Sequence, residues 1–169
     1  MYRQLVQLPV IAEDLGAKAA EGQPVLQQYG IPGMRVTQFG FGAYLPASAH
    51  APHNYAENLL AYTSTHDTNT TRGWFRSLNE SDHRGLAAYA GLAPNDKTVT
   101  DHLMRPTLQS LTRLTTLPVQ DILNLDKTHR INTPGGSGID RIWQLLPNLL
   151  AGDITERLRS STLMTGRVS

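Results

Sequence analysis

Short apolar runs alternate along the chain with loops and with stretches of helical periodicity. Four of these runs have the length and partly β-branched character of buried strands. They are residues 8–12, 34–39, 59–63 and 116–119. Because strands that alternate with helical segments usually form a parallel sheet, the pattern predicts an α/β fold.

Helical segments are predicted between these strands. The first covers residues 24–29, with Gly30 as the stop signal, and the second has Trp74, Phe75 and Leu78 on one face. The third covers residues 81–89, with Ser81 or Asp82 as the N-cap, and the fourth covers residues 101–114. A last helix opens at Asp153. Pro106 is expected to kink its helix or to lie in the first turn. Residues 132–136 are predicted to form a loop.

Composition narrows the class of protein. The 169 residues are enough for one ordinary domain. A net charge of +1 gives no basic field for nucleic acid, and the absence of cysteine excludes disulfides and thiol chemistry. No apolar run approaches the roughly 18 residues that span a bilayer, and the N-terminus has no signal-peptide pattern. We therefore expect a soluble, cytoplasmic protein that binds neither nucleic acid nor membrane.

Polar and acidic residues directly follow the predicted strands, where active sites of parallel α/β folds lie. Glu13 and Asp14 end the first strand, and a carboxyl group in an apolar neighbourhood can serve as a general acid and base. His66 and Asp67 end the third strand, where a carboxylate could hold sugar hydroxyls or stabilise positive charge. The alternative is that these acids merely cap the helices that follow.

Other polar motifs are weaker. Residues 132–135, Asn-Thr-Pro-Gly, could face a ligand or form a plain turn. The pair His50 and His53 lies in a proline-rich loop without a third ligand nearby, so no metal site is expected. Neither a dinucleotide-binding nor a phosphate-binding glycine motif is complete. Six aromatic residues include candidates for stacking on sugars, although most such positions are core: Tyr29, Phe39, Phe41, Tyr44, Tyr55 and Trp74.

Taken in order, these segments resemble one family, and the resemblance covers nearly the whole chain. The segments are Ile-Ala-Glu-Asp-Leu-Gly at 11–16, Gly-Ile-Pro-Gly-Met-Arg-Val-Thr-Gln-Phe at 30–39, Pro-His-Asn-Tyr at 52–55, Tyr-Thr-Ser-Thr-His-Asp at 62–67, Thr-Thr-Arg-Gly-Trp-Phe at 70–75, Pro-Val-Gln-Asp-Ile-Leu at 118–123 and Asn-Thr-Pro-Gly at 132–135. The chain is similar to the 4-α-glucanotransferases (amylomaltases, disproportionating enzymes) of glycoside hydrolase family 77.

The resemblance implies a (β/α)₈ barrel that transfers α-1,4-glucan segments to glucose or another glucan by a retaining mechanism. By position in the motifs, Glu13 matches the acid/base and Asp67 the acid that stabilises the transition state. His66, Asn132 and Pro134 match substrate-binding positions. The family implies α-1,4-glucans and maltooligosaccharides as ligands, and no metal or other cofactor.

The family nucleophile is an aspartate in a motif that resembles Arg-Ile-Asp-His-Phe-Arg, and this chain contains no such motif. Asp14 directly follows Glu13 and cannot replace a residue of the preceding strand. We therefore expect residues 1–169 to be the C-terminal half of the barrel, with about four strands. We expect this half to lack the nucleophile, to be inactive alone and to self-associate through its exposed barrel edges.

The loops also depart from the family pattern. Thr68 and Asn69 stand where the family usually has Asn-Asp, and the segment 139–144 keeps one tryptophan of the family run and loses its arginine. Two other functions stay open. One is a non-catalytic maltooligosaccharide-binding module, and the other is an α/β hydrolase with another substrate, for which no nucleophile elbow is visible.

Overall fold

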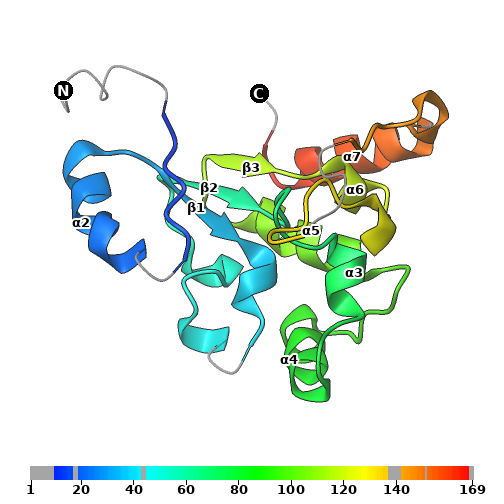
Figure 1. The fold of residues 1–169 in the computed structure, drawn as a ribbon, viewed down its shortest axis with the longest axis horizontal. Helices are drawn as coiled ribbons and strands as arrows, with labels where there is room; N and C mark the ends of the chain where they lie inside the picture. The colour runs from blue at the N-terminus through cyan, green and yellow to red at the C-terminus, as the bar shows by residue number, and fades with distance from the viewer. Residues whose placement is uncertain (1–9, 17–18, 43–44, 137–141, 151, 168–169) are drawn as a thin grey trace.

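A parallel three-stranded sheet lies at the centre of the computed structural model (Figure 1). The structure describes residues 10–16, 19–42, 45–136, 142–150 and 152–167. The strands are β1 (Gly33–Val36), β2 (Leu59–Tyr62) and β3 (Leu114–Thr116), and they are neighbours in the order of the sequence. The expectation of an α/β fold with parallel strands is confirmed.

Helices and single helical turns connect the strands. The α-helices are α2 (Ala19–Tyr29), α3 (Thr71–Phe75), α4 (Glu80–Ala90), α5 (Val99–Gln109), α6 (Val119–Ile122) and α7 (Gly152–Met164). Short 3₁₀ turns cover 37–40, 45–47, 52–54, 127–129 and 147–149. Among the described residues, no helix is long and apolar enough to cross a membrane.

The predicted strand at 8–12 is wrong over the residues that the structure describes, since 10–16 form no strand. One backbone hydrogen bond joins the Ala12 N–H to the carbonyl of Pro32 at 2.8 Å. The ladder ends there because Pro32 has no N–H to donate and because the Asp14 side chain, not a main-chain carbonyl, accepts from the Met34 N–H at 2.6 Å. The described sheet therefore has three strands instead of four.

Two other strand predictions need their boundaries moved. The second strand ends at Val36, and residues 37–40 turn into a 3₁₀ helix in which the Thr37 hydroxyl bonds those of Tyr55 (3.1 Å) and Thr107 (2.8 Å). The last strand lies at Leu114–Thr116, not at 116–119, because Pro118 caps α6 instead of continuing the strand.

The predicted helices are largely confirmed. The first extends back to Ala19, and Gly30 after it has φ +63°, a left-handed conformation that glycine adopts readily. The N-cap of α4 is Asn79, whose side chain accepts from the Asp82 N–H, not Ser81 or Asp82. The helix predicted for 101–114 runs from Val99 to Gln109 with Pro106 inside it. The loop after Asn132 and the last helix are also present.

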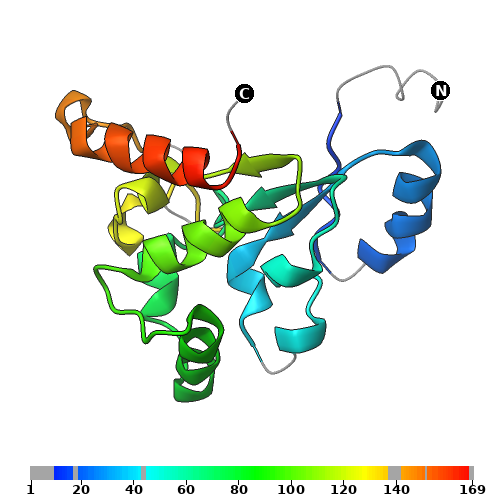
Figure 2. The same cartoon turned by 180° about the vertical axis from the view of Figure 1, so that it is seen from behind.

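An apolar cluster joins α3, α4 and α5. It contains Phe41, Phe75, Leu86, Val99 and Leu103, with Leu45, Trp74, Leu78 and Tyr89 packed against it. The helix α5 lies against the sheet with α7 beside it, as the rear view shows (Figure 2). Of the aromatic candidates for sugar stacking, Phe41 and Tyr55 are buried, Phe39 is half exposed, and Tyr44 lies outside the described residues.

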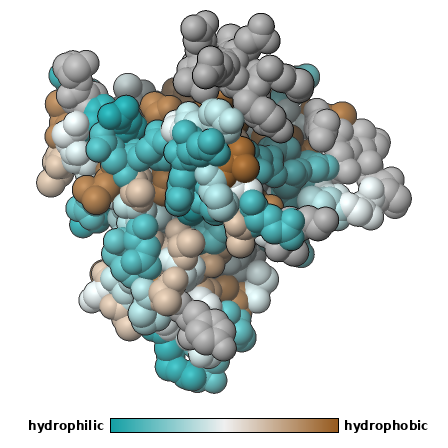
Figure 3. All heavy atoms as spheres, turned by 90° about the vertical axis from the view of Figure 1, so that its left-hand side faces the viewer, coloured by the Kyte–Doolittle hydropathy of each residue, from teal (hydrophilic) through white to brown (hydrophobic). Residues whose placement is uncertain are grey.

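The face that carries α2 is mixed in polarity, with apolar side chains in small separate groups among hydrophilic ones (Figure 3).

The side chain of Asp14 joins the segment before α2 to β1. Its side chain is 4% exposed and accepts from Arg35 Nη1 at 2.9 Å, from the Met34 N–H and from Gln23 Nε2. Burial raises the pKa of Asp14, but the hydrogen bonds and charge of Arg35 and the Met34 N–H outweigh it, so the pKa is lowered.

Replacing Asp14 should therefore destabilise the fold in a pH-dependent way. Because the pKa is lower in the folded chain than in the unfolded one, the carboxylate stabilises the fold at neutral pH. This contribution is lost as the pH falls below about 4, through the folded pKa. We expect Asp14→Asn to lose about 2 kcal/mol of unfolding free energy at neutral pH, measured by urea denaturation.

The same measurement in acid checks the cause. At about pH 3 the difference between Asp14→Asn and the wild type should shrink. The exposed Asp153→Asn on α7 is the matched control and should change little at either pH. Equal stability of Asp14→Asn and wild type at neutral pH would contradict this account.

Candidate active site

The three strands end at the same edge of the sheet. In the register, Val36 lies opposite Tyr62 and Tyr62 opposite Thr116, so the loops after β1, β2 and β3 start side by side. This is the edge where parallel α/β folds bind their ligands. The loop after β2 carries His66 and Asp67, which the sequence predicts as site residues.

A buried carboxylate joins the loop after β2 to the segment after β3. Asp121 in α6 has no exposed surface, and its Oδ2 accepts from the hydroxyls of Thr63 and Ser64, both at 2.6 Å. Its Oδ1 accepts from the Thr71 N–H, which opens α3, at 2.7 Å. Burial raises the pKa of Asp121, and the hydrogen bonds from Ser64, Thr63 and Thr71 oppose that rise.

Asp67 lies in the loop after β2 at this edge, and two other predicted site residues, His66 and Asn132, lie beside it. Asn132 Nδ2 donates to Asp67 Oδ1, and His66 Nε2 lies 3.4 Å from Asp67 Oδ2. The side chain of Asp67 is 43% exposed and that of His66 is 52% exposed, so both are accessible to a ligand. The helix-capping alternative for Asp67 is wrong, because Thr70 caps α3 by accepting from the Gly73 N–H at 3.2 Å.

Arg130 holds the same group together from the main-chain side. Its Nη2 donates to the carbonyl oxygen of Asp67 and its Nε to that of Asn132, each at 3.1 Å. Sequence reasoning missed both Arg130 and the binding role of Asp121. The available signal for Asp121 was its place just after an apolar run, whereas Arg130 lies in a loop whose path the sequence pattern does not define.

Glu13 and Pro134 are not joined to this cluster. Both are exposed, and no hydrogen bond or ion pair connects Glu13 to Asp67 among the described residues. Pro134 lies in the loop after Asn132, where Gly135 has φ +76° and the Gly136 N–H donates to the carbonyl of Thr133 at 2.8 Å. The structure thus brings together three of the five predicted site residues.

The histidines of the proline-rich loop have protein partners. His50 Nδ1 accepts from the Val36 N–H at 3.1 Å, and its pKa is lowered chiefly by burial. The two ring nitrogens of His53 contact the Tyr89 hydroxyl (3.2 Å) and the carbonyl of Pro46 (3.1 Å). In the part of the chain that the structure describes, no three His, Asp or Glu side chains are placed to hold a metal ion.

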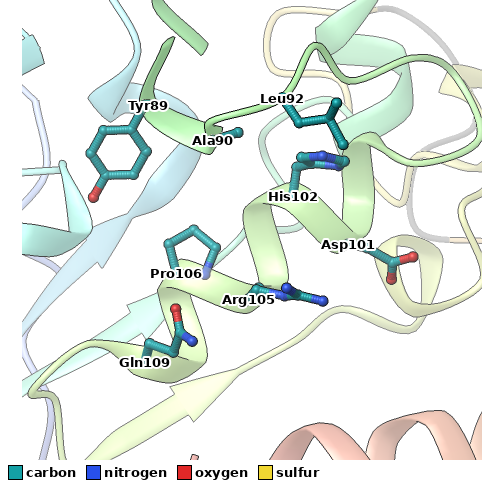
Figure 4. A pocket seen from close by; sticks show the side chains of 8 residues that line it. All are labelled: Tyr89, Ala90, Leu92, Asp101, His102, Arg105, Pro106 and Gln109. Atoms are coloured by element: carbon teal, nitrogen blue, oxygen red, sulfur yellow. The ribbon is translucent and has the colours of Figure 1, made fainter. Parts of the chain in front are cut away.

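Two hollows in the structure can be compared with the predicted site residues. A small cavity lies beside the loop of Asp67 and is lined by Ser64, Thr65, His66, Thr68, Thr70, Pro118, Gln120, His129, Arg130 and Ile131. A second hollow lies between the end of α4 and α5 and is lined by Tyr89, Ala90, Leu92, Asp101, His102, Arg105, Pro106 and Gln109 (Figure 4). None of the predicted site residues lines the second hollow.

Acids and polar side chains clustered at the carboxyl edge of a parallel sheet are typical of α/β enzymes. The sequence profile of the family described as 4-alpha-glucanotransferase, Glyco_hydro_77, matches residues 1–146. The chain therefore belongs to the 4-alpha-glucanotransferase family, glycoside hydrolase family 77, as its motifs suggest.

Individual relatives agree with this assignment. A 4-alpha-glucanotransferase from Thermus thermophilus is 35% identical over 168 residues, which are 96% of this chain and 33% of that protein. One from Aquifex aeolicus is 41% identical over 127 residues, which are 75% of this chain and 26% of that protein. The chain thus spans about a third or less of the length of the relatives it matches.

Solved structures agree as well. The amylomaltase from Streptococcus agalactiae in complex with acarbose superposes with a TM-score of 0.91 at 30% identity, over 99% of this chain and 34% of that one. An amylomaltase from Corynebacterium glutamicum, 19% identical, has a TM-score of 0.65 over 94% of this chain and 29% of its own, and it supports the fold alone.

Proposed function

We propose that residues 1–169 form the C-terminal half of a (β/α)₈ barrel and supply part of the active site of a 4-α-glucanotransferase. The cluster of His66, Asp67 and Asn132 at the carboxyl edge of the sheet carries this proposal, because it joins residues 65 positions apart that the family motifs assign to one site. The sequential order of the parallel strands and the superposition on the Streptococcus agalactiae amylomaltase support a barrel half.

In the proposed reaction, a carboxylate nucleophile attacks the anomeric carbon of an α-1,4-glucan while Glu13 protonates the glycosidic oxygen that leaves. The same Glu13 then takes the proton from the 4-hydroxyl of the acceptor sugar, which attacks the glycosyl-enzyme and releases the nucleophile. The two carboxyl groups of a retaining site lie about 5 Å apart. The exposure of Glu13 leaves its carboxyl group accessible to a sugar.

Asp67 acts by charge and by hydrogen bonding. Its carboxylate grips sugar hydroxyls and stabilises the positive charge that develops on the ring in the transition state. Asn132 fixes one carboxylate oxygen of Asp67 and His66 lies beside the other, so the group is oriented before the glucan binds. His66, Asn132 and Pro134 contact the substrate in this proposal.

In this proposal the nucleophile is supplied from outside residues 1–169, because the family motif that carries it is absent from the sequence. The chain alone should therefore turn over no maltotriose, as measured by glucose release. Fused to the part of the Thermus thermophilus relative that it does not match, it should disproportionate maltotriose. Robust turnover by the 169-residue chain alone would contradict the missing nucleophile.

The fused enzyme also tests Glu13. Glu13→Gln should lower kcat on the order of 10²- to 10⁴-fold, because the amide can neither give nor take the proton. Glu21→Gln is the matched control, since Glu21 is exposed on α2 and the change is the same. Near-normal turnover by Glu13→Gln would refute its role. Binding of maltooligosaccharides without turnover by the fused wild type would favour a binding module instead.

We further propose that the isolated chain self-associates through β3. In the described sheet β3 pairs only with β2, and Leu114 in β3 and Leu111 just before it are 54% and 74% exposed. An unpaired strand with exposed apolar side chains is a site of edge-to-edge association. The expected partner of this edge in the complete barrel would cover it.

Sedimentation velocity across a concentration series tests this association. The wild-type chain should form oligomers at micromolar concentrations, and Leu114→Lys should shift it towards monomer because a charge on the edge blocks pairing. Leu92→Lys is the control, since Leu92 is 66% exposed but follows α4, away from the sheet edge. A wild-type chain that stays monomeric throughout the series would overturn the proposal.

A further inference from the structure

Asp121 is a buried acid without a cationic partner. No Lys or Arg forms an ion pair with it among the described residues, and its hydrogen bonds come from the neutral residues Thr63, Ser64 and Thr71. Fully buried carboxyl groups are rare unless paired, because removing a charge from water is costly. The burial of an unpaired carboxyl group at this position therefore requires an explanation other than packing.

The donors to Asp121 lie at both ends of one loop. Thr63 and Ser64 directly follow β2, and Thr71 is the first residue of α3. The segment between them carries His66 and Asp67. The Asp121 carboxylate thus binds both ends of the loop that carries Asp67, at the point where the loop leaves β2 and at the point where it enters α3.

The same carboxylate also places the partners of Asp67. Asp121 lies on α6, and the chain continues from α6 to Arg130 and Asn132, which bind the main chain and the side chain of Asp67. Displacing α6 from the loop would therefore disturb both sides of the contact. The carboxylate of Asp121 connects α6 directly to both ends of the loop.

We propose that Asp121 is a positioning residue that acts through Asp67, by holding the loop 63–71 and the segment after α6 in one fixed arrangement. The inference rests on the proposed function, since it takes Asp67 as the acid that stabilises the transition state. A carboxylate suits this position because it accepts on both oxygens, whereas an asparagine would turn an NH₂ group towards one set of donors.

Hydrogen exchange read by mass spectrometry tests the positioning in the chain itself. Asp121→Asn should speed exchange in the peptide over 63–71 about tenfold or more, while peptides of α4 stay protected. Asp126→Asn is the matched control, because Asp126 lies on the same segment and its side chain accepts from Thr128 instead of from the loop 63–71. If Asp121→Asn also unfolds α4, exchange in 63–71 is measured instead on Ser64→Ala, which removes one donor to Asp121. Unchanged exchange in 63–71 overturns the proposal.

Kinetics of the fused enzyme described above test the action through Asp67. Asp121→Asn should lower kcat for maltotriose about 10- to 100-fold with a smaller change in KM. The double variant Asp121→Asn/Asp67→Ala should lose no more activity than Asp67→Ala alone. Losses that multiply, or full activity of Asp121→Asn, would refute the inference. If Asp67→Ala itself kept full activity, the proposed function would fail, which is a distinct outcome.

Discussion

The arrangement at the carboxyl edge of the sheet depends on one buried carboxylate. Three parallel strands end in register, but register alone leaves the loops beyond them free to diverge. Asp121 removes this freedom because it binds both ends of the loop after β2 from the helix that follows β3. Its burial is costly, and three donors on its two oxygens offset that cost. The local geometry therefore depends on a polar contact as much as on apolar packing.

A consequence is that Asp67 is oriented within this chain, without groups from elsewhere. Asn132 and Arg130 reach it from the segment that Asp121 anchors, and its side chain nevertheless remains partly open to solvent. Glu13, in contrast, lies on a segment whose described residues are held to β1 and Pro32 by the Asp14 side chain and by the main-chain bond from Ala12 to Pro32. The two acids of the proposed site thus differ in how strongly the described residues fix them.

The sequence predicted the helices best, because apolar periodicity and Gly30 describe local structure. It misplaced β3 since Pro118 ends the extended stretch earlier than the apolar run suggests, and it predicted a strand before Glu13 that Pro32 and the Asp14 side chain prevent. His66, Asp67 and Asn132 could be chosen from motifs, and the structure brings their side chains together. The role of Asp121 could not be predicted from the sequence, because it depends on the register of β2 and β3 and on donors 50 or more residues away.

A crystal structure of the 169-residue chain would show whether this chain alone assembles the loop of Asp67. We expect Asp121 to be buried, with its carboxylate within hydrogen-bond distance of the Thr63 and Ser64 hydroxyls and the Thr71 N–H, and Asn132 to contact Asp67. A structure in which Asp121 is exposed to solvent and the loop 63–71 lies away from Asn132 would contradict this expectation.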